Sequence, residues 1–309
     1  MKILYMGTPE IARTVLSALI ENGENVVAVV TREDKPRGRG NVMTPTPVRI
    51  LAEENGIKVY TPSTLRDGAF ENTLKEIDPD IIVVCAYGKI LPKSVLEYGK
   101  YGAVNLHVSL LPKYRGSAPM QRAIMNGESE TGVTIMQMNE GLDTGDIIAM
   151  EKFPITENDN LETIHDRSAE VGAALLLKVL SDIENGKAKF EKQDESEATY
   201  APKIEKSELK IDFSLDAKTV SCRMRGVTPP GAYGFLNGKM LKLLEHTVIS
   251  ASGDAGCVLE CDTKGVGYID IACGEGALRV YTVVPEGKGR MSAGDFVRGR
   301  KINVGDKLT

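Results

Sequence analysis

Apolar runs and amphipathic stretches alternate along the first half of the chain. Residues 2–7 (KILYMG) and 25–31 (NVVAVVT) have the pattern of strands, and the stretch between them has helical spacing that ends at Gly23. Helices are expected near 46–56 and 67–79, and a buried strand at 80–87 (DIIVVCAY). This order predicts a doubly wound α/β domain whose mostly parallel sheet is covered by helices on both faces.

The second half changes character after a long amphipathic helix predicted at 161–186. Residues 190–206 are polar and almost without periodicity, which is typical of a linker. Short β-like runs separated by Gly, Asn and Asp follow a helix near 214–226, and they favour a small OB-like β-barrel. We therefore expect a catalytic-type domain at 1–189, a linker at 190–206 and a barrel domain at 207–309.

Composition and charge narrow the class of protein. A chain of 309 residues with 42% hydrophobic and 26% charged residues, and no apolar run of membrane-spanning length, indicates globular domains without a membrane role. Five scattered cysteines and a start that runs directly into a strand favour the cytoplasm. The net charge of the chain is −5, but the last third, from Lys206 onward, has 15 Lys/Arg and 12 Asp/Glu and therefore a charge of +3. This excess of positive charge indicates either a polyanionic partner or only solvated surfaces.

The segment 103–119 (AVNLHVSLLPKYRGSAP) contains the side chains with the clearest chemistry. Alternation places Asn105 and His107 on one face of a strand, roughly 7 Å apart, at the end of a parallel sheet where ligands bind. Both can hydrogen-bond an oxygen that becomes negative during acyl transfer, although such a pair is often only structural. Pro112 and Gly116 turn the chain out of the strand, so 109–112 should form a fixed rim beside the pair.

The same segment, together with GLDTGDII at 141–148, resembles the signature of the 10-formyltetrahydrofolate-dependent formyltransferases. The resemblance implies that Asn105, His107 and Asp143 are catalytic and that 10-formyltetrahydrofolate donates the formyl group. It also implies three folate-binding loops. Tyr87 and Leu91 in the first of them could instead be core residues. These loops contain Tyr87, Gly88, Lys89, Ile90, Leu91, Ser109, Leu110, Leu111, Pro112, Asn139, Glu140, Gly141 and Leu142.

Members of this family differ in the acceptor of the formyl group, which can be methionyl-tRNA, a ribonucleotide, an amino-sugar nucleotide or water. Residues 31–49 (TREDKPRGRGNVMTPTPVR) form a long insertion that we expect to be irregular, with arginines that suit phosphate. Its GRG run is similar to the branch that acts on initiator methionyl-tRNA, with Arg39 as the main contact; an amino-sugar acceptor and a merely solvated loop are the alternatives. The tRNA-binding residues implied are Lys35, Arg37, Gly38, Arg39 and Gly40.

Other motifs in the chain support neither a dinucleotide site nor a metal site. The run MGTPE lacks the G-x-G-x-x-G of a dinucleotide site, and Cys257, Cys261 and Cys273 lack the paired spacing of a zinc site, so we expect neither a nicotinamide cofactor nor a metal. Arg223 and Arg225 could contact tRNA or pair with acidic neighbours. We expect the protein to act as a monomer.

Overall fold

The computed structural model describes residues 1–37, 40–299 and 301–309, which fall into two compact units. The first contains 1–119, 130–154 and 165–201, and the second contains 120–129, 155–164 and 202–309. Segments 120–129 and 155–164 thus group with the second unit although they precede the predicted linker.

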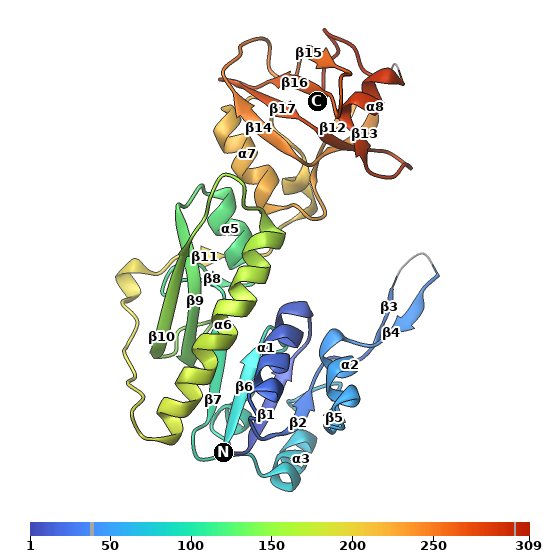
Figure 1. Ribbon diagram of the computed structural model, residues 1–309. Coiled ribbons are helices and arrows are strands. Elements are labelled where there is room, and N and C mark those ends of the chain that lie inside the picture. The colour runs from blue at the N-terminus through green and yellow to red at the C-terminus, as the bar shows by residue number, and fades with distance from the viewer. Residues whose placement is uncertain (38–39, 300) are drawn as a thin grey trace. The chain divides into compact units, whose positions relative to one another are not determined.

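A seven-stranded sheet forms the centre of the first unit (Figure 1). Its order is β10-β9-β7-β6-β1-β2-β5; β9 and β10 run antiparallel to their neighbours and the other pairs are parallel. The strands are β1 (Ile3–Gly7), β2 (Val26–Val30), β5 (Val59–Tyr60), β6 (Ile81–Cys85), β7 (Ala103–His107), β9 (Glu130–Gln137) and β10 (Ile147–Pro154).

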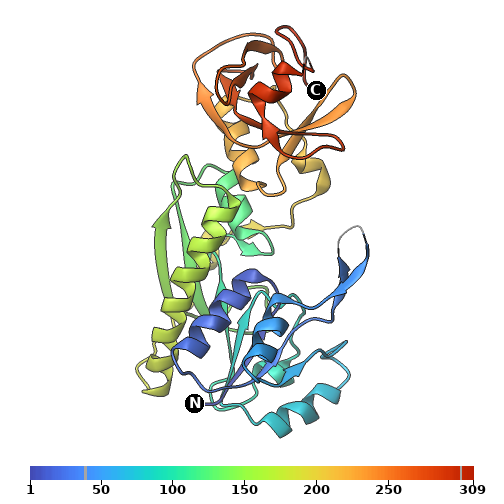
Figure 2. The same cartoon turned by 45° about the vertical axis from the view of Figure 1, so that its right-hand side comes forward.

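Helices cover both faces of this sheet. They are α1 (Glu10–Glu21), α2 (Pro47–Glu54), α3 (Ala69–Ile77), α4 (Lys93–Leu96) and α6 (Leu161–Glu184), while α5 (Pro119–Met125) belongs almost entirely to the segment 120–129 of the second unit. On one face the Tyr5 hydroxyl donates to the Ala12 carbonyl of α1, and Leu106 lies against Gly172 of α6; Figures 1 and 2 show α1 and α6 on the same side. On the other face, α3 and α4 bury Phe70, Leu74 and Val95 against strand residues including Met6 and Val84.

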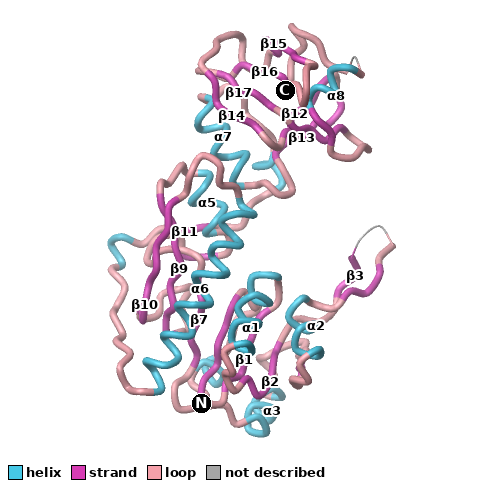
Figure 3. Tube along the Cα trace, viewed as in Figure 1, coloured by secondary structure: helices cyan, strands magenta, loops and turns pink. Residues whose placement is uncertain are grey.

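The segment after α6 runs along the edge strand β10 (Figure 3). Glu191 forms an isolated antiparallel bridge with Ile147, and a two-stranded parallel ladder joins β8 (Arg115–Gly116) to β11 (Tyr200–Ala201). A single 3-10 turn, η1 (Glu195–Glu197), lies between these contacts. The part of the predicted linker up to residue 201 is therefore hydrogen-bonded to the first unit, while the domain limits at 189 and 207 stay predictions.

The insertion after β2 differs from the expectation of an irregular loop. It contains an antiparallel hairpin of β3 (Lys35–Arg37) and β4 (Val42–Thr44), in which Lys35 pairs with Thr44 and Pro36 with Met43. The prediction failed because Pro, Gly and charged residues obscure a three-residue strand pattern. Gly40 lies in the turn that precedes β4, and Gly38 and Arg39 lie outside the described residues.

The second unit is built from antiparallel strands around its own core. One sheet has the order β12-β13-β18-β19 and the other β14-β17-β16-β15, and Leu241, Val283, Ile269 and Leu278 from both sheets share one buried cluster. The elements are η2 (Lys206–Leu209), α7 (Ala217–Gly226), β12 (Ala232–Leu236), β13 (Lys239–Leu243), β14 (His246–Ile249), β15 (Val258–Asp262), β16 (Tyr268–Ala272), β17 (Ala277–Val280), β18 (Thr282–Pro285), β19 (Met291–Ser292) and α8 (Ala293–Arg298). The fold class predicted from the hydrophobic pattern is confirmed.

Within the described part of the chain, no helix combines the length and apolar character needed to cross a membrane.

Candidate active site

Asn105 and His107 project from β7 toward the face of the sheet that α3 and α4 cover. Asn105 lies in register with Val84 of β6, which belongs to the core on that face, whereas the intervening Leu106 contacts α6 on the opposite face. The two side chains therefore lie on one face near the C-terminal end of β7, as the alternation predicts. No described residue hydrogen-bonds the Asn105 side chain, so its amide is available to a ligand.

The imidazole of His107 is buried, with one nitrogen hydrogen-bonded and the other facing a carboxylate. Its Nε2 lies 3.0 Å from the Tyr114 carbonyl oxygen, and because a carbonyl only accepts, Nε2 must carry a proton and donate it. Its Nδ1 lies 3.7 Å from Oδ2 of Asp143, within the range of an ion pair when the ring is protonated. The ring orientation is therefore fixed, and Nδ1 is the nitrogen that faces the carboxylate.

Asp143 reaches His107 from the loop between β9 and β10. Its backbone has φ of 52°, a left-handed conformation that is uncommon outside glycine. The Gly116 amide donates to Oδ2 of Asp143 at 2.8 Å, so one carboxylate oxygen faces both this donor and His107. The structure thus brings the Asn105 amide, the His107 imidazole and the Asp143 carboxylate to one end of the sheet.

The loop after β6 divides into buried and exposed residues. Tyr87 and Leu91 are buried in the core with α3 and α4, while Ile90 is 71% exposed and Gly88 lies at the surface. Burial raises the pKa of the Tyr87 hydroxyl to about 12. Lys89 donates to the carbonyls of Pro62 and Ser63, which fixes the loop. Ile90 is thus better placed to meet a ligand than either buried residue.

The other two predicted folate loops present different surfaces. Ser109 is fully buried and donates to the Lys113 carbonyl, so it shapes the turn of which Leu110 and Pro112 are half-buried members; Leu111 is buried. In the 139–142 loop Asn139 accepts from the Gly141 amide and the Thr144 hydroxyl, and Glu140 is exposed. Leu142, next to Asp143, is 60% exposed. An exposed apolar side chain therefore lies next to the trio of Asn105, His107 and Asp143.

The sequence motifs did not indicate three further residues around Asn105, His107 and Asp143. The Tyr114 carbonyl bonds His107, Gln193 bonds the Asp143 carbonyl, and Arg115 bonds Gln193. Arg115 and the Tyr114 carbonyl lie within the quoted signature, but nothing in its pattern distinguishes them. Gln193 belongs to the segment expected to be a linker, and its amide donates to the carbonyls of Asp143 and Gly145 at 2.8 and 2.7 Å. No local signal could identify Gln193, because its partners lie 48 and 50 residues away.

The basic insertion is a second candidate surface. Lys35 is exposed on the hairpin, and so are Val42 and Met43 on the opposite strand, with Val42 at 66%. Arg49, in contrast, lies on α2 and pairs with Asp34 and Glu53 at 2.9 and 2.8 Å, so this arginine is already neutralised.

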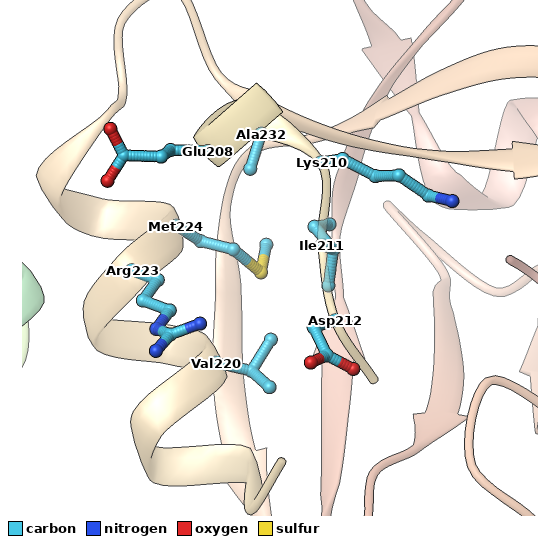
Figure 4. Close-up of a pocket in the computed structure, with 8 residues that line it drawn as sticks. All are labelled: Glu208, Lys210, Ile211, Asp212, Val220, Arg223, Met224 and Ala232. Carbon is cyan, nitrogen blue, oxygen red and sulfur yellow. The ribbon is translucent and has the colours of Figure 1, made fainter. Parts of the chain in front are cut away.

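In the second unit, a small hollow lies between the 208–212 segment and α7 (Figure 4). Val220, Met224 and Ile211 face one another across it, while the charged ends of Lys210 and Glu208 extend to opposite sides. Arg225 donates to the carbonyls of Thr156 and Asp159, so of the two arginines left open it has a structural role. Arg223, the other of these arginines, lines the hollow, and none of the predicted catalytic or folate-binding residues does.

The cysteines and acidic residues do not assemble into a metal site in the described ranges. All five cysteines are free thiols, and no three His, Cys, Asp or Glu side chains of residues 1–37, 40–299 and 301–309 gather closely enough to hold an ion. Burial raises the pKa of Cys85 to about 12 and that of Cys273 to about 11, as expected of structural thiols.

Comparison with known families defines the class of protein. A family model described as "Formyl transferase" matches residues 1–180, more than half of the chain, and a model described as "Formyl transferase, C-terminal domain" matches residues 203–301. The α/β unit and the antiparallel unit are thus those of a formyl transferase.

Two curated relatives narrow the class further. The "Methionyl-tRNA formyltransferase" of Citrifermentans bemidjiense is 45% identical over 309 residues, which is 100% of this chain and 96% of the relative. That of Caldanaerobacter subterraneus subsp. tengcongensis is 44% identical over 312 residues and 100% of both chains. The chain therefore belongs to the methionyl-tRNA formyltransferase family and is a formyl-transferring enzyme.

Solved structures support the same fold. WlaRD, a sugar 3N-formyl transferase crystallised in the presence of dTDP and 5-N-formyl-THF, has a TM-score of 0.67 and 22% identity. The match covers 94% of this chain and 99% of WlaRD. At this identity the likeness shows the fold alone.

Proposed function

We propose that the enzyme transfers a formyl group from 10-formyltetrahydrofolate to the α-amino group of methionine on initiator methionyl-tRNA. The observation that supports this most directly is the cluster of Asn105, His107 and Asp143 at the end of the sheet, in a chain that matches 96% and 100% of the length of two family relatives. We also propose a cytoplasmic location, because aminoacyl-tRNA is used there. We propose a monomer as the active form, because Asn105, His107 and Asp143 all come from one chain.

The residues around the trio fit a reduced folate. Ile90 and Leu142 expose apolar surface on two loops, which suits a flat heterocycle, and the half-buried 110–112 turn offers a rim beside it. The solved WlaRD structure, obtained with a formylated folate, supports a folate in this fold. We assign the remaining residues of the three loops to shaping this site: Gly88, Lys89, Ser109, Asn139, Glu140 and Gly141 by holding the turns, and Tyr87 and Leu91 from the core beneath.

The chemistry that the trio supports is attack by the methionine amine on the formyl carbon. A carbon–nitrogen bond forms to the amine, the bond to the folate nitrogen breaks, and the amine proton is passed on so that the folate nitrogen leaves protonated. In this proposal the Asn105 amide and the Nδ1–H of protonated His107 stabilise the oxygen that becomes negative, because Nε2 of His107 already donates to the Tyr114 carbonyl. The Asp143 carboxylate faces Nδ1 and offers a base for the amine proton.

Replacement of Asp143 by asparagine tests this assignment. We expect turnover to fall by about 100-fold or more, because the variant cannot stabilise the imidazolium or accept a proton, while the fold is retained. Formylation of initiator methionyl-tRNA would be measured beside the circular dichroism spectrum. Near-normal turnover in the folded variant would refute the role of Asp143.

The acceptor is tested separately in the insertion 31–49. We expect Arg39→Ala to slow formylation of initiator methionyl-tRNA more than that of elongator methionyl-tRNA, because the lost guanidinium is proposed to probe the acceptor end. Lys35→Ala in the same insertion is the matched control for loss of positive charge. Equal losses on both tRNAs would leave Arg39 a charge contact only, and preference for an amino-sugar nucleotide in competition would overturn the acceptor.

A further inference from the structure

Gln193 connects a buried arginine to the loop that contains Asp143. Its Oε1 accepts from Nε and Nη2 of Arg115 at 3.0 and 2.7 Å, and its Nε2 donates to the Asp143 and Gly145 carbonyls. A glutamine side chain has two donor hydrogens and two acceptor positions, so all four are used. Because guanidinium only donates and carbonyls only accept, the amide has one possible orientation.

Arg115 anchors this connection from the other side of the site. Its side chain is 1% exposed, and Glu195 pairs with it through two parallel hydrogen bonds of 2.9 and 2.8 Å. The Arg115 guanidinium lowers the pKa of the Glu195 carboxyl, so the pair remains charged. Arg115 also precedes Gly116, whose amide donates to the Asp143 carboxylate. The network therefore contacts Asp143 at its backbone and, through the next residue, at its side chain.

The loop combines an uncommon backbone conformation with close packing. Asp143 has a left-handed backbone, and the Gly145 backbone lies so close to the Gln137 carbonyl that a Cβ would be 1.6 Å from its oxygen. The Gln193 amide holds this segment at the carbonyls of Asp143 and Gly145. Loss of these hydrogen bonds is expected to free the segment and to change the distance between Asp143 Oδ2 and His107 Nδ1.

We infer that Gln193 is a positioning residue for formyl transfer, which fixes the 143–145 loop so that the Asp143 carboxylate faces His107. Gln193 is buried and acts through Asp143. This role rests on the proposed function. It gives the segment between the two matched family domains a part in the reaction.

The test is Gln193→Glu in the full chain. Glutamate keeps an acceptor for Arg115 but replaces both N–H donors with an oxygen that faces two carbonyl oxygens. We expect kcat with initiator methionyl-tRNA to fall by about 100-fold, because displacement of a reacting group by about 1 Å has effects of this size, while both KM values change by less than about 3-fold. A kcat within about 2-fold of the wild type would overturn the inference.

Gln137→Glu is the matched control. The Gln137 side chain also donates to two backbone carbonyls, those of Tyr101 and Ala103, and only its backbone, which the substitution leaves in place, packs against Gly145. We expect its kcat to stay within about 2-fold of the wild type. An equal kcat loss in both variants would mean that Gln193 is merely structural. If Gln193→Glu does not fold, Gln193→Met, which keeps the length but neither donor, is judged by the same criterion.

Non-additivity provides a readout that general destabilisation would not change. In single-turnover measurements Gln193→Glu should slow an Asp143→Asn enzyme far less than it slows the wild type, because the residue that it positions is already inactive. Full additivity would contradict the inference. Failure of the wild-type chain to formylate methionyl-tRNA would instead refute the proposed function, so the two failures are distinguishable.

Discussion

At the residue scale, two glycines in the sequence motifs are explained by close packing. A Cβ on Gly7 would lie 2.7 Å from Cβ of Ala12 and 3.0 Å from the Cys85 carbonyl oxygen, so Gly7 lets α1 approach the sheet. This gives the MGTPE turn a structural reason that involves no dinucleotide. Gly145 has a stricter requirement, because the atom in its way belongs to the backbone of β9.

Gly145→Ala is therefore expected to damage the site more than the core. The 143–145 loop must move away from Gln137, which separates Asp143 from His107, and we expect kcat to fall by about 100-fold. Formylation rates and thermal midpoints would be compared with Gly289→Ala, where a Cβ meets nothing within 4 Å and the backbone is not left-handed. A Gly145→Ala enzyme of wild-type rate would contradict this account of the loop.

At the residue scale the trio was also the most predictable part of the site. Asn105 and His107 share a face because strands alternate, and that follows from the local sequence alone. The tautomer of His107 did not follow, since it depends on the Tyr114 carbonyl in a turn with φ of 61°. Arg115, Gln193 and Glu195 could not be found either, because their contacts join residues 78 to 80 apart and no alternation or spacing reports them.

At the element scale, helices were predictable where caps and apolar spacing agree, and the β3–β4 hairpin was not. Helix α7 shows the first case: Asp216 precedes it and accepts from the Thr219 amide, as an N-cap should. The hairpin lacks such signals, since each of its strands is three residues long and one contains Pro36.

The cap of α7 gives a stability prediction. Asp216→Ala should reduce the free energy of unfolding by about 1 kcal/mol, because the Thr219 amide loses its acceptor. The hydrogen bonds to Thr219 lower the pKa of the Asp216 carboxyl, so this stabilisation is present above its unfolded pKa and is lost as pH falls through the folded value. Urea titration would measure the change. Asp216→Asn, which keeps an acceptor, should lose less, and an equal loss would contradict the capping role.

At the scale of the whole molecule, the two units have separate cores, as the change of pattern after residue 190 predicts. Leucine, isoleucine and valine from α/β elements fill the first, and inward residues of two antiparallel sheets fill the second. Their limits in the sequence were less predictable than their folds, because the units interleave at 120–129 and 155–164. The grouping of these two segments with the second unit depends on three-dimensional contacts, which local sequence patterns do not indicate.

The second unit should be sensitive to mild acid through His246. Desolvation lowers its pKa below 6.5, with the nearby Arg225 charge adding to the effect; its ring nitrogens contact the Ser221 hydroxyl and the Leu244 carbonyl. The unfolded chain thus binds a proton more readily, and stability falls as pH drops below 6.5. We expect His246→Gln to lose less stability than the wild type between about pH 7.5 and about pH 5.5, measured by calorimetry. An unchanged pH dependence would exclude His246 as its source.

The hydrogen bonds of residues 191–201 also determine where this polypeptide can be divided. A fragment that ends at 189 would retain Asn105, His107 and Asp143 but lose Gln193, Glu195 and the Thr199 and Ala201 partners of the 112–118 turn. One that ends at 201 would keep all of them. In an exchange of C-terminal domains between relatives, a junction after residue 201 should therefore leave this network intact, whereas an earlier junction replaces Gln193 and Glu195 with the relative's residues.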